Sequence, residues 1–252
     1  MKKFSAGILV YILLVLAFTV VLGGLQEVLS LNYSVVMLPQ LAPGLAFLLL
    51  SVIFREINFN LNIKTDPWVI YKMVLAFILP FLILFKIYLI GNMLDMPMIM
   101  HKGRLAELWP VLPGMILGAV GEEIGWRGFL QPRFEKKFPV VVSGIFTGIF
   151  WGLWHVQLYT NGVAFMLSFL LFTISSSVVV TWMLRGTSYN SIVASLFHLS
   201  LNLGFFFFFY GSLNHTGVML TNGIVWTIPA LIIGFSANKQ TFYNDVIKAE
   251  SR

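Results

Sequence analysis

Five polar side chains suited to hydrolytic chemistry fall inside strongly apolar stretches of this sequence. They are Glu122, Glu123, His155, His198 and Asn202. Ionisable groups are unfavourable within membrane spans, so their presence there indicates a functional site. A glutamate or histidine can act as a general base, and histidine and asparagine can donate hydrogen bonds to an oxyanion. The set therefore favours attack of water on an amide bond.

The two adjacent glutamates are expected to have different partners. Neighbouring residues of a helix point about 100° apart, so Glu122 and Glu123 cannot share one partner equally. Glu123 lies four residues before Arg127, on the same helix face, which predicts an ion pair. Glu122 then has no local cation, and burial would suit it to proton transfer. The alternative, that both acids pair with basic groups of neighbouring helices, stays open.

The histidines and the asparagine are ambiguous when each is taken alone. His155 follows Trp151 and Trp154, and a single histidine beside aromatic residues is often a packing residue. His198 and Asn202 are four residues apart and share one helix face, but such a pair could equally form a polar contact between helices. Two further histidines, His101 and His215, fall in predicted outer loops and receive no role.

The elements that position these residues are predicted to be membrane helices. The chain has 252 residues, of which 58% are hydrophobic and 10% charged, and its mean hydropathy is +0.88. Soluble domains carry about 25% charged residues, so lipid is the expected solvent. Because cysteine is absent, thiolate chemistry is excluded, and a metal such as zinc would need His, Asp or Glu ligands.

Eight apolar segments are close to the length of about 20 residues that a membrane helix needs. We predict a single all-α polytopic domain over residues 1–252, with the polar site in a cavity between the fourth, fifth and seventh helices. The first segment lacks the cleavage pattern of a signal peptide, so we expect it to remain as a span. The eight segments are 4–23, 35–54, 69–90, 109–130, 140–159, 163–184, 191–210 and 218–236.

The distribution of basic residues predicts the orientation. With the amino terminus in the cytoplasm, thirteen Lys and Arg residues fall on the cytoplasmic side and only Lys102 and Arg104 lie outside. Both termini are then cytoplasmic, and the net charge of +6 reflects topology, with no nucleic-acid partner expected. The composition is compatible with a bacterial plasma membrane. The cytoplasmic set is Lys2, Lys3, Arg55, Lys64, Lys72, Arg127, Arg133, Lys136, Lys137, Arg185, Lys239, Lys248 and Arg252.

Three short motifs carry a family resemblance. Glu122-Glu123-Ile-Gly-Trp-Arg127, then Trp151-Gly-Leu-Trp-His155, then His198-Leu-Ser-Leu-Asn202 follow one another over about residues 110–205. In order and spacing they resemble the CPBP family, which covers CAAX-type prenyl proteases and bacteriocin-processing or self-immunity proteins and is also called the Abi family. The family pattern has Phe where this chain has Trp151, so an aromatic residue is retained.

The resemblance implies an intramembrane endopeptidase in which Glu122 and His155 activate water. His198 and Asn202 would form the oxyanion hole, with Glu123 and Arg127 in support. Members are often labelled metalloproteases, which implies a divalent metal such as zinc on Glu122, His155 and His198. No H-E-x-x-H motif supports zinc, and a glutamate with a histidine can work as a metal-free base. The implied partners are the lipid bilayer and a membrane-associated peptide or lipidated protein tail.

The predicted helix limits raise one geometric difficulty. If the fourth span ends near Leu130, Glu122 lies about 12 Å from the cytoplasmic end of its helix. If the fifth begins near Val140, His155 lies about 22 Å from the same side. The two would then miss each other, unless residues 131–140 dip into the protein or the helices tilt into a shared wet cavity.

Two other classes of function stay open from the sequence. A non-catalytic immunity or scaffolding protein could keep the same fold. A transporter could use Glu122 and the histidines as a proton relay, although no repeated halves support this. The substrate and the oligomeric state stay open as well.

Overall fold

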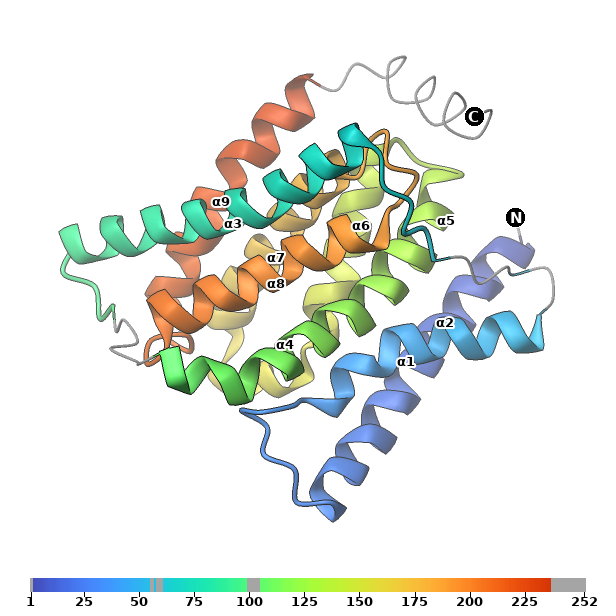
Figure 1. Ribbon diagram of the computed structural model, residues 1–252, viewed down its shortest axis with the longest axis horizontal. Coiled ribbons are helices and arrows are strands. Elements are labelled where there is room, and N and C mark those ends of the chain that lie inside the picture. The colour runs from blue at the N-terminus through green and yellow to red at the C-terminus, as the bar shows by residue number, and fades with distance from the viewer. Residues whose placement is uncertain (1, 55–56, 58–60, 99–104, 237–252) are drawn as a thin grey trace.

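A computed structural model describes residues 2–54, 57, 61–98 and 105–236 (Figure 1), and within them all regular structure is helical. This confirms the predicted all-α polytopic fold. The long helices are α1 (Lys2–Val28), α2 (Ala42–Ile53), α3 (Pro67–Met93), α4 (Leu105–Gly125), α6 (Val140–Trp154), α7 (Val163–Met183), α8 (Ser191–Phe209) and α9 (Thr216–Ser236). Shorter elements are η1 (Leu38–Leu41), η2 (Trp126–Leu130), α5 (Gln131–Glu135) and η3 (Val156–Asn161).

Each of the eight predicted segments contains a helix, although their lengths differ. Five of them, α1, α3, α7, α8 and α9, are long and apolar enough to cross a membrane. The segment of η1 and α2 and the helix α6 are apolar but shorter. The count of eight crossings and the cytoplasmic termini remain predictions. Of the residues on which the orientation rests, Arg55, Lys102, Arg104, Lys239, Lys248 and Arg252 lie outside the described residues, as does His101.

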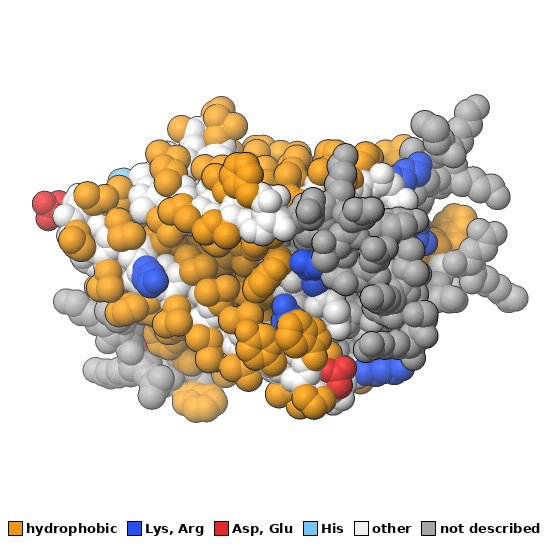
Figure 2. All heavy atoms as spheres, turned by 90° about the horizontal axis from the view of Figure 1, so that it is seen from above, with side chains coloured by type: hydrophobic (Ala, Val, Ile, Leu, Met, Phe, Trp, Pro, Cys, Tyr) orange, Lys and Arg blue, Asp and Glu red, His pale blue; other side chains and the backbone are white. Residues whose placement is uncertain are grey.

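Hydrophobic side chains dominate the surface, as the composition requires. Figure 2 shows one face that is mostly hydrophobic, with most of its Lys and Arg side chains toward one end. Large exposed hydrophobic residues of the molecule include Val20 on α1 (76% exposed) and Val74 on α3 (53% exposed). Apolar patches of this extent fit a lipid environment.

The predicted end of the fourth span at Leu130 is wrong. The backbone keeps helical angles from α4 through a π-helical turn, η2, into α5. This continuous helical stretch ends at Glu135. Pro132 lies in the first turn of α5, where the preceding wide turn accommodates its missing N–H. The fifth span is also shorter than predicted: α6 ends at Trp154, five residues before Tyr159.

These corrected limits remove the expected mismatch in depth. Glu122 lies thirteen residues before the end of α5, which is about 20 Å along the helix. His155 lies fifteen residues after the start of α6, which is about 22 Å. Both side chains therefore reach a similar level, without the dip of residues 131–140 that the sequence suggested as one solution.

Glycines on α4 allow the connection between α1 and α2 to pack directly on the helix. A Cβ atom at Gly114 would lie 1.9 Å from the carbonyl oxygen of Val35, and one at Gly118 would lie 2.2 Å from Oε1 of Gln40. Small residues permit such close approach between membrane helices. The contact brings Gln40 of η1 to the level of Glu122.

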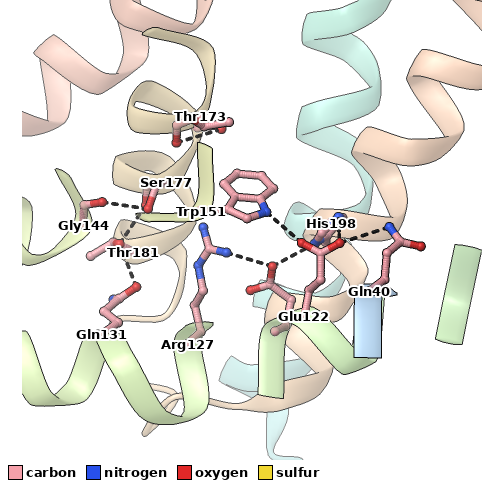
Figure 3. Close-up of polar contacts among 12 residues, drawn as sticks. Gln40, Glu122, Arg127, Gln131, Gly144, Trp151, Thr173, Ser177, Thr181 and His198 are labelled. Atoms are coloured by element: carbon pink, nitrogen blue, oxygen red, sulfur yellow. Dashed lines mark hydrogen bonds and ion pairs between the residues drawn. The ribbon is translucent and has the colours of Figure 1, made fainter. Parts of the chain in front are cut away.

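A second glycine face joins α6 to α7. A Cβ atom at Gly148 would lie 2.6 Å from Cα of Ile174, and Ser177 donates a hydrogen bond of 2.7 Å to the carbonyl oxygen of Gly144. Figure 3 includes this contact between Gly144 and Ser177. Since α6 carries Trp151 and ends beside His155, this packing sets the position of one wall of the site.

The glycine contact at α6 gives a stability prediction. Gly148→Ala is expected to lower the free energy of unfolding by about 1–3 kcal/mol, because its methyl group would meet the backbone of α7. Gly24→Ala is the matched control, since nothing lies within 4 Å of a Cβ atom there and alanine favours a helix. Thermal unfolding of both variants in one detergent tests this, and a Gly148→Ala protein as stable as the control would contradict it.

Candidate active site

The predicted site residues surround one cavity of about 440 Å³. Glu122 from α4, His155 at the end of α6, and His198 and Asn202 from α8 all line it. The helices α4, α6 and α8 are the fourth, fifth and seventh of the predicted segments. The structure therefore brings together the four side chains to which the sequence assigned chemistry.

Glu122 is fully buried and is held by two neutral donors. Gln40 Nε2 donates to its Oε1 at 3.0 Å, and Trp151 Nε1 donates to its Oε2 at 2.7 Å. Figure 3 shows Glu122 among Gln40, Trp151 and His198, whose Nε2 lies 4.0 Å from Glu122 Oε1. In the described part of the chain no Lys or Arg pairs with this carboxylate. Because a carboxylate has about four acceptor positions, it can still accept hydrogen bonds from water.

Glu123 organises a buried group of polar side chains beside Glu122. Arg127 Nη1 donates to Glu123 Oε1 at 2.8 Å, which confirms the predicted pair. The same oxygen accepts a hydrogen bond of 2.9 Å from His198 Nδ1. The guanidinium also lies over the ring of Trp151, 4.8 Å from its centre. Glu123 is therefore tied to the second motif and the third, a connection that helix spacing alone did not predict.

These contacts determine which nitrogen of each histidine carries hydrogen. A carboxylate or a carbonyl oxygen can only accept, so the nitrogen that faces it must be the donor. His198 Nδ1 therefore donates to Glu123, which leaves its Nε2 toward Glu122. His155 Nδ1 donates to the carbonyl oxygen of Trp151 at 2.7 Å. In the neutral ring, Nε2 of His155 is then an acceptor.

His155 is both packed by aromatic rings and placed at the cavity. Its ring lies edge-on to Trp154 at 5.1 Å and to Phe169 at 5.0 Å between ring centres. The helix ends just before it, and its backbone leaves helical geometry at φ −73° and ψ 60°. The packing role and the chemical role that the sequence set against each other are thus compatible in one residue.

Two contributors were missed by the sequence reasoning. Gln40 lies in the second apolar segment, and its polar amide there was a signal of the same kind as Glu122. Trp151 was noted only as a departure from the family pattern. Its indole N–H binds Glu122 and its ring face contacts Arg127, two interactions that join separate motifs.

The divalent metal that the resemblance implied on Glu122, His155 and His198 stays a prediction. Within the described residues, no three His, Cys, Asp or Glu side chains are grouped so that they could hold a metal ion. His155 and His198 each use Nδ1 in a hydrogen bond, which leaves Nε2 of each ring for a proton or another partner.

Comparison with known proteins supports the assignment made from the three motifs. Residues 104–204 match the family model described as type II CAAX prenyl endopeptidase Rce1-like. The chain is similar to CAAX prenyl protease 2 of Methanococcus maripaludis, with 28% identity over 161 residues that make up 59% of each chain. It is also similar to lysostaphin resistance protein A of Staphylococcus aureus, with 26% identity over 217 residues, which are 82% of this chain and 51% of that protein.

The match spans only about half to three fifths of the length of these curated relatives. It nevertheless includes Glu122, His155 and His198, which the fold collects at one cavity. The likeness to the type II CAAX prenyl endopeptidase Rce1-like family thus covers residues 104–204, the segment that carries the three motifs.

Proposed function

We propose that this protein is an intramembrane endopeptidase that cleaves a membrane-associated peptide or a lipidated protein tail. The observation that carries the proposal is the placement of Glu122, His155, His198 and Asn202 on one cavity. The Rce1-like segment supports proteolysis at the level of the family. Endoproteolysis needs a base for water and donors for an oxyanion, and this set contains both.

In the proposed reaction, Glu122 and His155 activate the attacking water. The two acceptor positions left on Glu122 and the Nε2 of His155 can accept its hydrogens. Water oxygen bonds to the scissile carbonyl carbon while its proton passes to this pair. The same pair then returns the proton to the departing amine as the C–N bond breaks.

His198 and Asn202 are proposed to stabilise the oxyanion that forms in this step. His198 is held through Nδ1 by Glu123, so a proton on Nε2 would give it a donor on the side of the cavity. Asn202 lies one turn further along α8 and lines the same cavity. Donors held in place before the reaction are effective because little reorganisation accompanies the development of charge.

The walls of the cavity indicate an apolar substrate segment. Beyond the polar residues, the lining is largely aliphatic and aromatic and comes from the connection between α1 and α2 and from α4, α6, η3, α7, α8 and α9. Apolar walls with few polar groups are typical of sites that orient an apolar ligand. A CAAX tail, a bacteriocin precursor and another small membrane peptide would each present an apolar segment to these walls. We therefore propose a role in peptide maturation or self-immunity. The wall residues include Phe169, Phe172, Leu201, Phe205 and Met219.

The second candidate function is a resistance or scaffolding role that needs no proteolysis. It is favoured by the likeness to lysostaphin resistance protein A, which extends over 82% of this chain. Under this alternative, a protein without Glu122 would still confer the phenotype when it is present at normal abundance.

Replacement of the proposed base should abolish cleavage. Glu122→Gln is expected to lower the cleavage rate by about 10²–10⁴-fold, since the amide cannot take a proton from water. The measurement compares the membrane peptidomes of cells that carry the wild-type protein and cells that carry the variant. Peptides that differ between the two are then incubated with each purified protein, and their cleavage is measured. Glu27→Gln, at an exposed position of α1, is the control. Wild-type cleavage by Glu122→Gln would refute the assignment.

Removal of the amide donor should affect the transition state more than substrate binding. Asn202→Leu keeps the size of the side chain and is expected to lower kcat by about 10²–10³-fold with little change in KM. Steady-state kinetics on the peptide identified above gives both constants. Asn92→Leu, at an exposed position of α3, should leave them unchanged. A change confined to KM would place Asn202 in substrate binding only.

Glu123 should behave differently from Glu122. Glu123→Gln leaves Arg127 buried without its anionic partner Glu123. We therefore expect the free energy of unfolding to fall by about 3–5 kcal/mol. Glu122 has no Lys or Arg partner among the described residues, so Glu122→Gln should destabilise the protein less. Thermal unfolding of both variants in the same detergent gives the comparison, and the reverse order would contradict these roles.

A further inference from the structure

Lys72 is a buried cation that the proposed reaction does not use. It is the sixth residue of α3, and only 3% of its surface is exposed. In the described part of the chain it forms no ion pair with a carboxylate. An ammonium group has three donors and is unfavourable to bury without a partner, so the surroundings of this residue need an explanation.

Two tryptophans form an aromatic frame around the ammonium group. Its Nζ lies 4.8 Å from the ring centre of Trp68 and 4.4 Å from that of Trp182. Such contacts attract a cation through the ring faces but supply no hydrogen-bond acceptor of the kind that carboxylate or phosphate oxygens offer. The frame therefore holds the charge in place and leaves its donor capacity for another group.

The charges near Lys72 favour an anion. Arg185, in the connection between α7 and α8, places a second positive charge near Lys72. The acid nearest in the sequence, Asp66, accepts a hydrogen bond of 2.8 Å from the backbone N–H of Val69 and caps α3. Basic side chains from two elements therefore lie near one another here.

Hydrogen bonds between two connections hold these elements together. Asn62 Nδ2 donates to the carbonyl oxygen of Thr187 at 3.0 Å, and Asn190 Nδ2 donates to that of Lys64 at 2.8 Å. The connection before α3 and the connection before α8 are therefore joined beside Trp68 and Trp182. Elements joined in this way need little further ordering when a ligand binds.

The position of Lys72 along α3 corresponds to the headgroup level of a bilayer. The helix has 27 residues, or about 40 Å, close to the thickness of about 40–45 Å of a bilayer with its headgroups. Its first turns carry Trp68 and Tyr71, which are half exposed, as is common at membrane interfaces. Exposed Ile70, Val74 and Phe77 continue from there as an apolar face that acyl chains can follow.

We propose that Lys72, framed by Trp68 and Trp182 and assisted by Arg185, binds the phosphate of an anionic phospholipid headgroup. Basic pockets between membrane helices on the cytoplasmic side bind such headgroups. The apolar face of α3 beside the pocket favours a lipid over free phosphate as the source of this group. The site is separate from the Glu122 cavity, whose lining does not include these residues.

The test compares the thermal unfolding of purified protein with added phosphatidylglycerol, phosphatidylcholine of the same acyl chains, or inorganic phosphate. Phosphatidylglycerol is expected to raise Tm by about 2–4 °C more than phosphatidylcholine. Lys72→Met should lose this increment, while Lys72→Arg should keep most of it. Lys86→Met removes an exposed lysine of the same helix and should keep it entirely.

Three outcomes would overturn the proposal. They are an equal effect of the two lipids, an unchanged increment in Lys72→Met, or an equal effect of inorganic phosphate, which would assign the pocket to a free anion. If Lys72→Met does not fold, native mass spectrometry of wild-type and Lys86→Met protein in an equimolar mixture of the two lipids decides. Preferential retention of phosphatidylglycerol supports the site, and retention without preference refutes it.

Discussion

The structure depends on the burial of two adjacent carboxylates inside an apolar helix bundle. Glu122 and Glu123 point to different sides of α4, so each needs its own donors from a different neighbour. Glu123 receives donors from Arg127 and His198, whereas Glu122 receives the neutral donors Gln40 and Trp151. In the proposed reaction, this contrast separates a carboxylate that stabilises the architecture from one that exchanges a proton with water.

The supply of those donors requires helices to approach more closely than ordinary side chains allow. Glycines on α4 admit the segment that carries Gln40, and glycines on α6 admit α7. The hydrophobic effect gives no drive for association between helices in lipid, so close packing and interhelical hydrogen bonds must supply it. The polar site and the glycine faces are therefore parts of one solution, since neither the hydrogen bonds nor the cavity would form with the helices further apart.

Much of this arrangement was predictable from the sequence because its signals are local. The helices follow from apolar runs, and the Glu123–Arg127 pair follows from a spacing of four residues. The continuation of the fourth helix to Glu135 was not predictable in the same way, because the stretch after Leu130 contains a proline and several polar residues. The contacts of Gln40 and Trp151 with Glu122 depend on tertiary packing between distant segments, on which local spacing carries no information.

The connection between α1 and α2 forms a separate part of the cavity wall. It contributes Gln40 and part of the cavity lining, including Val36 and Met37, yet it precedes the segment matched by the family model. Substitutions in this connection can alter the entrance and the hydration of Glu122 while the other motifs stay as they are. For the proposed protease, this connection therefore offers positions at which the fit of a substrate can change while Glu122, His155, His198 and Asn202 stay in place.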